Sequence, residues 1–80
     1  MATTELGFDE ALFEKLKKHR TALAQAEGVP PYVIFHDSTL REMAELKPAS
    51  LGALSRISGV GTAKLERYGQ AFVEVISSHE

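Results

Sequence analysis

Apolar residues recur at steps of three and four in three separate segments of this sequence, the spacing that gathers side chains on one face of an α-helix. The segments begin near Asp9, near Asp37 and after Gly61. No two segments share the alternation of apolar and polar residues that paired strands need. The pattern therefore predicts an all-α fold, a compact bundle of about five helices.

The first helix is predicted to run from Asp9 to about Glu27, where Gly28 can end it. Asp9 is a suitable N-cap, and Phe8 before it can form a hydrophobic staple. The expected apolar face holds Leu12, Phe13, Leu16, Leu23 and Ala26. The expected polar face holds Lys17, Lys18, Thr21 and Gln25.

The stretch VPPYVIFHD, residues 29–37, contains a local conflict. Its β-branched and aromatic residues favour a strand, whereas Pro30 and Pro31 are suited to the start of a helix. Because no other segment offers a partner strand, we predict a single buried helical turn over Tyr32 to Phe35.

Capping residues place the remaining helices. Asp37 or Ser38 is expected to cap a helix that stops before Pro48, and Ser50 a short helix after it. The inward residues of these helices are predicted to be Leu40, Met43, Ala44 and Leu46, then Leu51, Leu54 and Ile57, and in the last helix Leu65, Tyr68, Phe72, Val75 and Ile76. The predicted core contains Leu12, Leu16, Val33, Phe35, Leu40, Met43, Leu54, Val60, Leu65, Phe72 and Ile76.

Length and composition limit the chain to one small domain of 80 residues. The absence of cysteine excludes disulfides and thiolate metal sites. Neither a signal peptide nor an apolar run of the ~20 residues that a membrane span needs is visible. We therefore expect a cytoplasmic monomer without membrane contact, with a flexible leader over residues 1–7 and a helical domain over residues 8–80.

A glycine turn, Gly59-Val60-Gly61, separates the last two predicted helices. Both glycines allow positive φ, and Val60 between them can enter the core. One interpretation is a structural connector, with Gly59 as the residue after the helix C-cap. The other is a helix-hairpin-helix-like anion site, because the amides of Gly61, Thr62 and Ala63 would point outward at a helix start. The pattern alone favours the connector.

Longer stretches carry a family resemblance. They read VPPYVIFHDSTLREMAELKP, ISGVGTAKLERYGQAFVEVI and LFEKLKKHRTALAQAEG. Together they resemble the HRDC domain, the helicase-and-RNase-D C-terminal module, over about residues 8–76. Their sequence is closer to the bacterial RecQ version of this domain than to the RNase D version. The resemblance implies a five-helix HRDC-like bundle appended to an ATP-dependent DNA helicase of repair and recombination, associated with the bacterial nucleoid. There it would bind single-stranded or branched DNA, or contact other domains of the helicase.

The resemblance also implies a basic and aromatic DNA-contact patch rather than an enzymatic site. Carried over by position, its members are Tyr32, Lys64, Lys17, Lys18, Arg20 and Arg67. An exposed tyrosine can stack on an unpaired base, and lysine and arginine can bind phosphates.

Structural interpretations of the same side chains stay open. Tyr32 can be exposed for stacking, or half buried with its hydroxyl bonded. Lys17 and Lys18 can be the solvated side of an amphipathic helix. Arg20 lies at the edge of the apolar stripe, where it can pair with a carboxylate and support the fold.

The charge balance argues against strong DNA binding. Residues 1–27 hold four basic and five acidic side chains, residues 28–48 two and three, and residues 49–80 three of each, for a net charge of −2. Because phosphate neutralisation supplies most non-specific affinity, we expect weak binding at physiological salt.

No catalytic or metal site is predicted. The histidines are scattered without i,i+4 pairing, and the serines lack a nucleophile elbow: His19, His36 and His79, and Ser38, Ser50 and Ser58. Lys64 follows Gly61 too closely for a phosphate-binding P-loop. We therefore expect a non-catalytic domain without cofactor or metal.

Two functions remain, with a third as an alternative. The first is an accessory domain that modulates DNA binding by a RecQ-type helicase. The second is a docking module that contacts the helicase core or a partner protein, which the acidic balance favours. The third is the C-terminal substrate-binding domain of an RNase D-like exoribonuclease.

Overall fold

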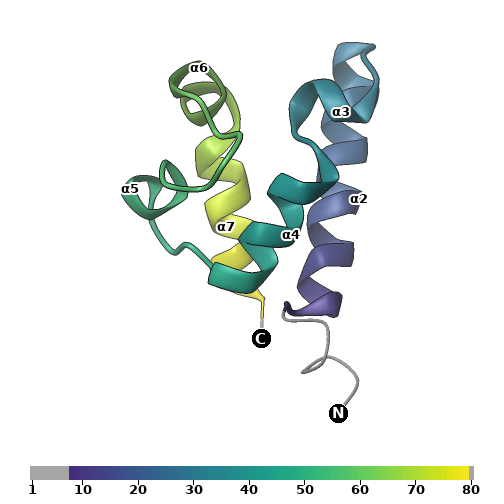
Figure 1. Ribbon diagram of the computed structural model, residues 1–80. Helices are drawn as coiled ribbons and strands as arrows, with labels where there is room; N and C mark the ends of the chain where they lie inside the picture. The colour runs from purple at the N-terminus through teal and green to yellow at the C-terminus, as the bar shows by residue number, and fades with distance from the viewer. Residues whose placement is uncertain (1–7, 80) are drawn as a thin grey trace.

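The computed structural model describes residues 8–79, and every regular element in that range is helical (Figure 1). The separate helices are α2 (Glu10–Glu27), α3 (Pro31–Ile34), α4 (Asp37–Leu46) and α5 (Leu51–Leu54). The last three elements, α6 (Thr62–Lys64), the π-helical turn η1 (Leu65–Gly69) and α7 (Gln70–Ser78), follow one another without a break and form one C-terminal helix. The predicted all-α bundle of five helical units is confirmed. The leader expected over residues 1–7 lies outside the described residues.

Helix α2 begins and ends at the expected residues. The Asp9 carboxylate accepts a hydrogen bond from the Leu12 amide at 3.1 Å, and Gly28 ends the helix with a φ of 69°. Phe8 packs edge to face on Phe13 with ring centroids 5.3 Å apart, which is the predicted staple. The helix packs against α3, α4 and α7, so it is the central support of the bundle.

The buried side of α2 differs from the predicted apolar face. Its buried residues follow one another in steps of four: Leu12, Leu16, Arg20 and Ala24. Ala26, which was expected on this face, is exposed, and Phe13 and Leu23 are half-buried at its margins. Steps of four drift slowly around a helix, so the contact follows one narrow ridge that includes a charged residue.

Helix α3 is the predicted single turn, but only part of it is buried. Ile34 and the following Phe35 are fully buried, whereas Val33 is 41% exposed. The prediction that Val33 belongs to the core is wrong, because consecutive residues of a helical turn point about 100° apart and Ile34 takes the inward position.

The caps of α4 and α5 were predicted with mixed success. His36, not Asp37 or Ser38, is the N-cap of α4, and Asp37 lies in the first turn, where its carboxylate accepts a hydrogen bond from Arg20 of α2. Ser50 caps α5 as predicted: its hydroxyl accepts a hydrogen bond from the Ala53 amide at 3.1 Å.

Two leucines expected to point inward are exposed. Leu46 lies in the last turn of α4, just before Lys47 takes a left-handed φ of 50°. Leu51 begins α5 and rests on η1 where Gly69 has no side chain; a Cβ there would lie 2.9 Å from Leu51 Cδ2. The rest of the predicted core is buried, except that Leu65 is only half-buried.

Phe35 joins α3 to the C-terminal helix. Its ring lies edge to face on Phe72 at 5.0 Å and on Tyr68 at 6.2 Å between centroids. His19 of α2 also packs on Phe72, and its buried Nε2 has no hydrogen-bond partner within residues 8–79. Burial lowers the pKa of His19, because the charged imidazolium would lose its hydration there.

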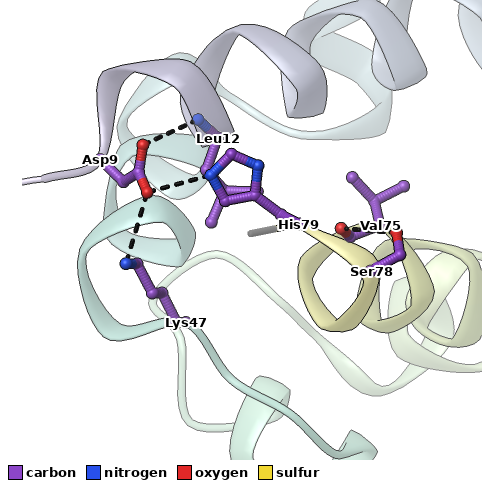
Figure 2. A network of polar contacts seen from close by, with 6 residues as sticks. All are labelled: Asp9, Leu12, Lys47, Val75, Ser78 and His79. Atoms are coloured by element: carbon purple, nitrogen blue, oxygen red, sulfur yellow. Dashed lines mark hydrogen bonds and ion pairs between the residues drawn. The ribbon is translucent and has the colours of Figure 1, made fainter.

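Asp9 connects the start of α2 to the ends of α4 and α7 (Figure 2). Its Oδ2 lies 3.0 Å from His79 Nε2 at the end of α7 and 3.4 Å from Lys47 Nζ at the end of α4. The backbone hydrogen bond from Leu12 is the largest cause that lowers the pKa of Asp9 to about 2, and the side chains of His79 and Lys47 lower it further.

No helix within residues 8–79 is long and apolar enough to cross a membrane.

Candidate nucleic-acid interface

Tyr32 is exposed, which decides between its two interpretations. It lies at the second position of α3, with 60% of its surface accessible. Pro30 and Pro31 set the start of this turn, and the buried Ile34 and Phe35 anchor its other side. The turn therefore presents an aromatic ring to solvent from a well-packed base.

Arg20 has a structural role, as the second interpretation of that residue foresaw. It is buried, and its Nη1 donates hydrogen bonds to the Phe35 carbonyl at 2.9 Å and to Asp37 Oδ1 at 2.7 Å. The hydrogen bond from Arg20 holds the pKa of Asp37 below its usual range. The guanidinium therefore fixes the chain on both sides of His36, and it is not accessible to a phosphate.

Lys17 and Lys18 lie on different sides of α2. Lys17 is half-buried, 3.3 Å from Glu14 Oε2 and 4.7 Å above the Phe13 ring. Lys18 is exposed, one residue on and so about 100° further around the helix. The two lysines therefore do not form one basic patch.

Helix α6, which contains Lys64, lies at the same end of the bundle as α3 (Figure 1), and η1 with Arg67 follows it directly. Lys64 Nζ is 5.9 Å from the centroid of the Phe35 ring. Arg67 lies over the Tyr68 ring, and its Nη2 donates to Glu27 Oε1 at 3.4 Å. Of the predicted patch, Tyr32, Lys64 and Arg67 thus share this end.

Tyr68 and Glu27 attach the C-terminal helix to the end of α2. The Tyr68 hydroxyl donates a hydrogen bond to Glu27 Oε1 at 2.8 Å, and this bond raises the pKa of Tyr68. Tyr68 itself is buried, as the sequence predicted. Glu27 places a negative charge beside Arg67, which reduces what Arg67 can offer to a phosphate.

The glycine turn uses its two glycines differently. Gly59 has a φ of 91°, and a Cβ at this position would collide with Thr39 Oγ1, whose hydroxyl donates to the Ser58 carbonyl at 3.0 Å. Gly61 has a φ of −81°, and a Cβ there would meet no atom within 4 Å. The expectation that both glycines serve positive φ is wrong for Gly61.

The place of Gly59 in the chain also differs from the prediction. Helix α5 ends at Leu54 with Ser55 as its C-cap, so Gly59 is not the residue after a helix cap. It belongs to a run of tight turns in which the Val60 amide donates to the Ile57 carbonyl at 3.1 Å. Val60 is buried, as predicted, and connects this loop to the core.

One residue beside the site, His36, was not selected from the sequence. His36 lies beside Tyr32, with ring centroids 6.1 Å apart and planes at 20°. The sequence offered no direct signal for this contact, because the backbone of Phe35 and His36 is extended and the spacing rules of a helix do not apply there. Within residues 8–79, no group of three or more metal-ligating side chains occurs.

Comparison with known proteins identifies the fold family. The family model described as the HRDC domain matches residues 9–76, most of the chain. The chain belongs to the HRDC domain family. A solved structure described as D. radiodurans RecQ HRDC domain 3 is similar to this domain, with a TM-score of 0.81 and 30% identity over 84% of this chain and 88% of that chain. The predicted HRDC resemblance and its helical architecture are thereby confirmed.

Curated relatives of this HRDC domain are DNA helicases. It is 44% identical over 73 residues to the ATP-dependent DNA helicase RecQ of Haemophilus influenzae and 39% identical over 71 residues to that of Bacillus subtilis. It is 43% identical over 68 residues to the ATP-dependent DNA helicase UvrD2 of Mycobacterium tuberculosis. These matches cover 91%, 89% and 85% of this chain but only 12%, 12% and 10% of the respective relatives.

Proposed function

We propose that this HRDC domain is a non-catalytic accessory domain of a RecQ-type DNA helicase, where it modulates the binding of single-stranded or structured DNA. Support comes from relatives that are named as ATP-dependent DNA helicases and are about eight times longer than the matched stretch, since the match covers 12% of each. Other domains of such a parent carry ATP hydrolysis and unwinding. The domain then needs no cofactor, and it acts on the DNA of the bacterial nucleoid in the cytoplasm.

The observation that carries the proposal is the exposed ring of Tyr32 on a turn whose backbone is fixed by Arg20. A ring that is 60% exposed on a rigid base can stack on an unpaired base without first reorganising. Lys64 reaches the same end, and within residues 8–79 it has no ion-pair partner, so its ammonium group can bind a phosphate.

Low intrinsic affinity follows from the occupied cations. Arg20 is bound to Asp37, Lys17 lies beside Glu14, and Arg67 beside Glu27. Each carboxylate competes with phosphate for the same cation, and the chain carries a net charge of −2. We expect the 80-residue chain to bind single-stranded DNA with a dissociation constant of roughly 10⁻⁴–10⁻⁶ M at physiological salt, the range of non-specific contacts.

A salt-dependent titration with single-stranded and junction DNA tests this proposal. Lys64→Ala should weaken binding to every sequence and lower the slope of log affinity against log salt by about one. Lys15→Ala is the matched control, because Lys15 is an exposed lysine on the first half of α2. Binding that is absent even at low salt, or a salt slope unaffected by Lys64→Ala, would contradict the proposal.

A second candidate function is docking on the helicase core or on a partner protein. It is favoured by the negative net charge together with two exposed leucines, Leu46 and Leu51. In this case the separately expressed domain would bind the rest of the helicase, and Leu46→Ala and Leu51→Ala would weaken that binding while Tyr32→Ala would not.

A further inference from the structure

His36 lies beside Tyr32 at the exposed end of the bundle. The two ring centroids are 6.1 Å apart and the ring planes are inclined by only 20°. Both side chains are exposed, and within residues 8–79 neither ring has a hydrogen-bond or ion-pair partner. The pair is therefore available to a ligand from outside the domain.

The backbone of His36 is held from both sides. Phe35 and His36 are extended, with φ and ψ of −152° and 147° for Phe35 and −74° and 159° for His36. Successive residues of an extended chain point in opposite directions, so the buried Phe35 turns His36 outward. Arg20 binds the Phe35 carbonyl and the Asp37 carboxylate, the neighbours of His36 on either side. The orientation of His36 is thus built into the fold.

The arrangement of the rings suits a flat aromatic ligand. The two rings are stacked and nearly parallel, so their faces point in similar directions. Together they offer more aromatic surface to a ligand than Tyr32 alone. Nucleobases stack on both tyrosine and histidine, and such stacking tolerates any base sequence. Lys64, whose ammonium group lies 5.9 Å from the ring centroid of Phe35, supplies a positive charge at the same end.

We propose that Tyr32 and His36 act together as one stacking platform for unpaired bases of single-stranded DNA. The inference rests on the proposed DNA-binding function and adds His36 as a binding residue of that site. His36 widens the aromatic surface, and Lys64 contacts the phosphates of the strand that crosses it.

The test is a fluorescence titration of the 80-residue chain with a labelled single-stranded oligonucleotide at low salt, where weak binding is measurable. His36→Ala should weaken binding about three- to tenfold, and Tyr32→Ala at least as much. His36→Phe should bind like the parent, because it retains a ring at this position. Leu46→Ala is the matched control, because Leu46 is as exposed as Tyr32, at 60%, and lies at the end of α4; it should leave binding unchanged.

Two results separate this inference from the proposed function. If Tyr32→Ala weakens binding while His36→Ala does not, the platform is wrong and the DNA-binding function stands. If the parent binds junction DNA but no single-stranded DNA, the platform is wrong and the proposed function stands; if the parent binds neither, both are wrong. A loss in His36→Phe equal to that in His36→Ala would also overturn the platform, because it would show that the ring is not what the ligand contacts. Circular dichroism melts of each variant establish that all share the parent fold, as expected for an exposed cap residue without a side-chain capping bond.

Discussion

Alanine at Gly59 should destabilise the domain, whereas alanine at Gly61 should not. Gly59 has a φ of 91°, a conformation that costs a residue with a Cβ about 1–3 kcal/mol. The new Cβ would also displace the Thr39 hydroxyl from the Ser58 carbonyl, which it reaches at 3.0 Å, and the loss of that bond costs about 0.5–1.5 kcal/mol. Together these effects amount to about 1.5–4.5 kcal/mol, a large part of the stability of a small domain.

Gly61 is the matched control within the same turn. Its φ of −81° suits any residue, and the space around it is open. Alanine there reduces the entropy of the unfolded chain by about 0.4–1 kcal/mol, but it is a poorer N-cap than glycine. These effects oppose each other, so the net change should be close to zero.

Urea and thermal unfolding followed by far-ultraviolet circular dichroism measure both changes. Gly59→Ala should lower the melting temperature by about 6 °C or more, from about 4–8 °C per kcal/mol in a domain of this size. Gly61→Ala should melt within a few degrees of the parent. Equal melting of Gly59→Ala and the parent, or equal losses in the two variants, would refute the assignment of positive φ and close contact to Gly59 alone.

Three further predictions concern buried and capping charges. Arg20→Ala should destabilise the domain by about 1–3 kcal/mol in urea unfolding, because it leaves the Phe35 carbonyl without its partner; unchanged stability with lost DNA binding would instead make Arg20 a phosphate contact. The pKa of Asp9 is lowered to about 2. The Asp9 carboxylate therefore adds to the free energy of unfolding above the ordinary aspartate range near 4, and this stabilisation is lost as the pH falls toward 2. Asp9→Asn should flatten the acid limb of stability against pH, and an acid limb identical to that of the parent would contradict this. The pKa of His19 is lowered by burial, so the free energy of unfolding should fall as the pH drops below about 6.5, the ordinary pKa of histidine, toward the lower pKa of the folded state. His19→Leu should remove that loss of stability. The measurement compares the urea midpoints of the parent and the variant at neutral and mildly acidic pH.

Local features of the fold were predictable because they depend on neighbours in the sequence. The Asp9 cap, the Phe8–Phe13 staple and the Gly28 terminus each involve residues within a few positions of one another. The helical form of the Pro-Pro turn was also predictable, since no other segment of the sequence shows a strand pattern that could pair with it. Which side of that turn is buried was not, because it depends on how α3 lies against α2.

Contacts between distant residues decided the site, and the sequence does not specify them. Arg20 could be expected to pair with a carboxylate, but its partner Asp37 lies 17 residues further along the chain. Gly59 and Gly61 look equivalent in sequence, and they are distinguished by the backbone angles of the folded turn and by the contact of Gly59 with Thr39 of α4. The position of His36 beside Tyr32 depends on the extended backbone between α3 and α4, which Arg20 holds.

The measurement that tests the central claim most directly is a nuclear magnetic resonance titration of the isotope-labelled 80-residue chain with single-stranded DNA. It reports which amides change environment as DNA is added. The account predicts that the changes concentrate from Tyr32 to His36 and around Lys64, with fast exchange as expected for weak binding. Changes centred on Lys18, or on Leu46 and Leu51, would contradict it, as would a spectrum that DNA leaves unchanged at low salt.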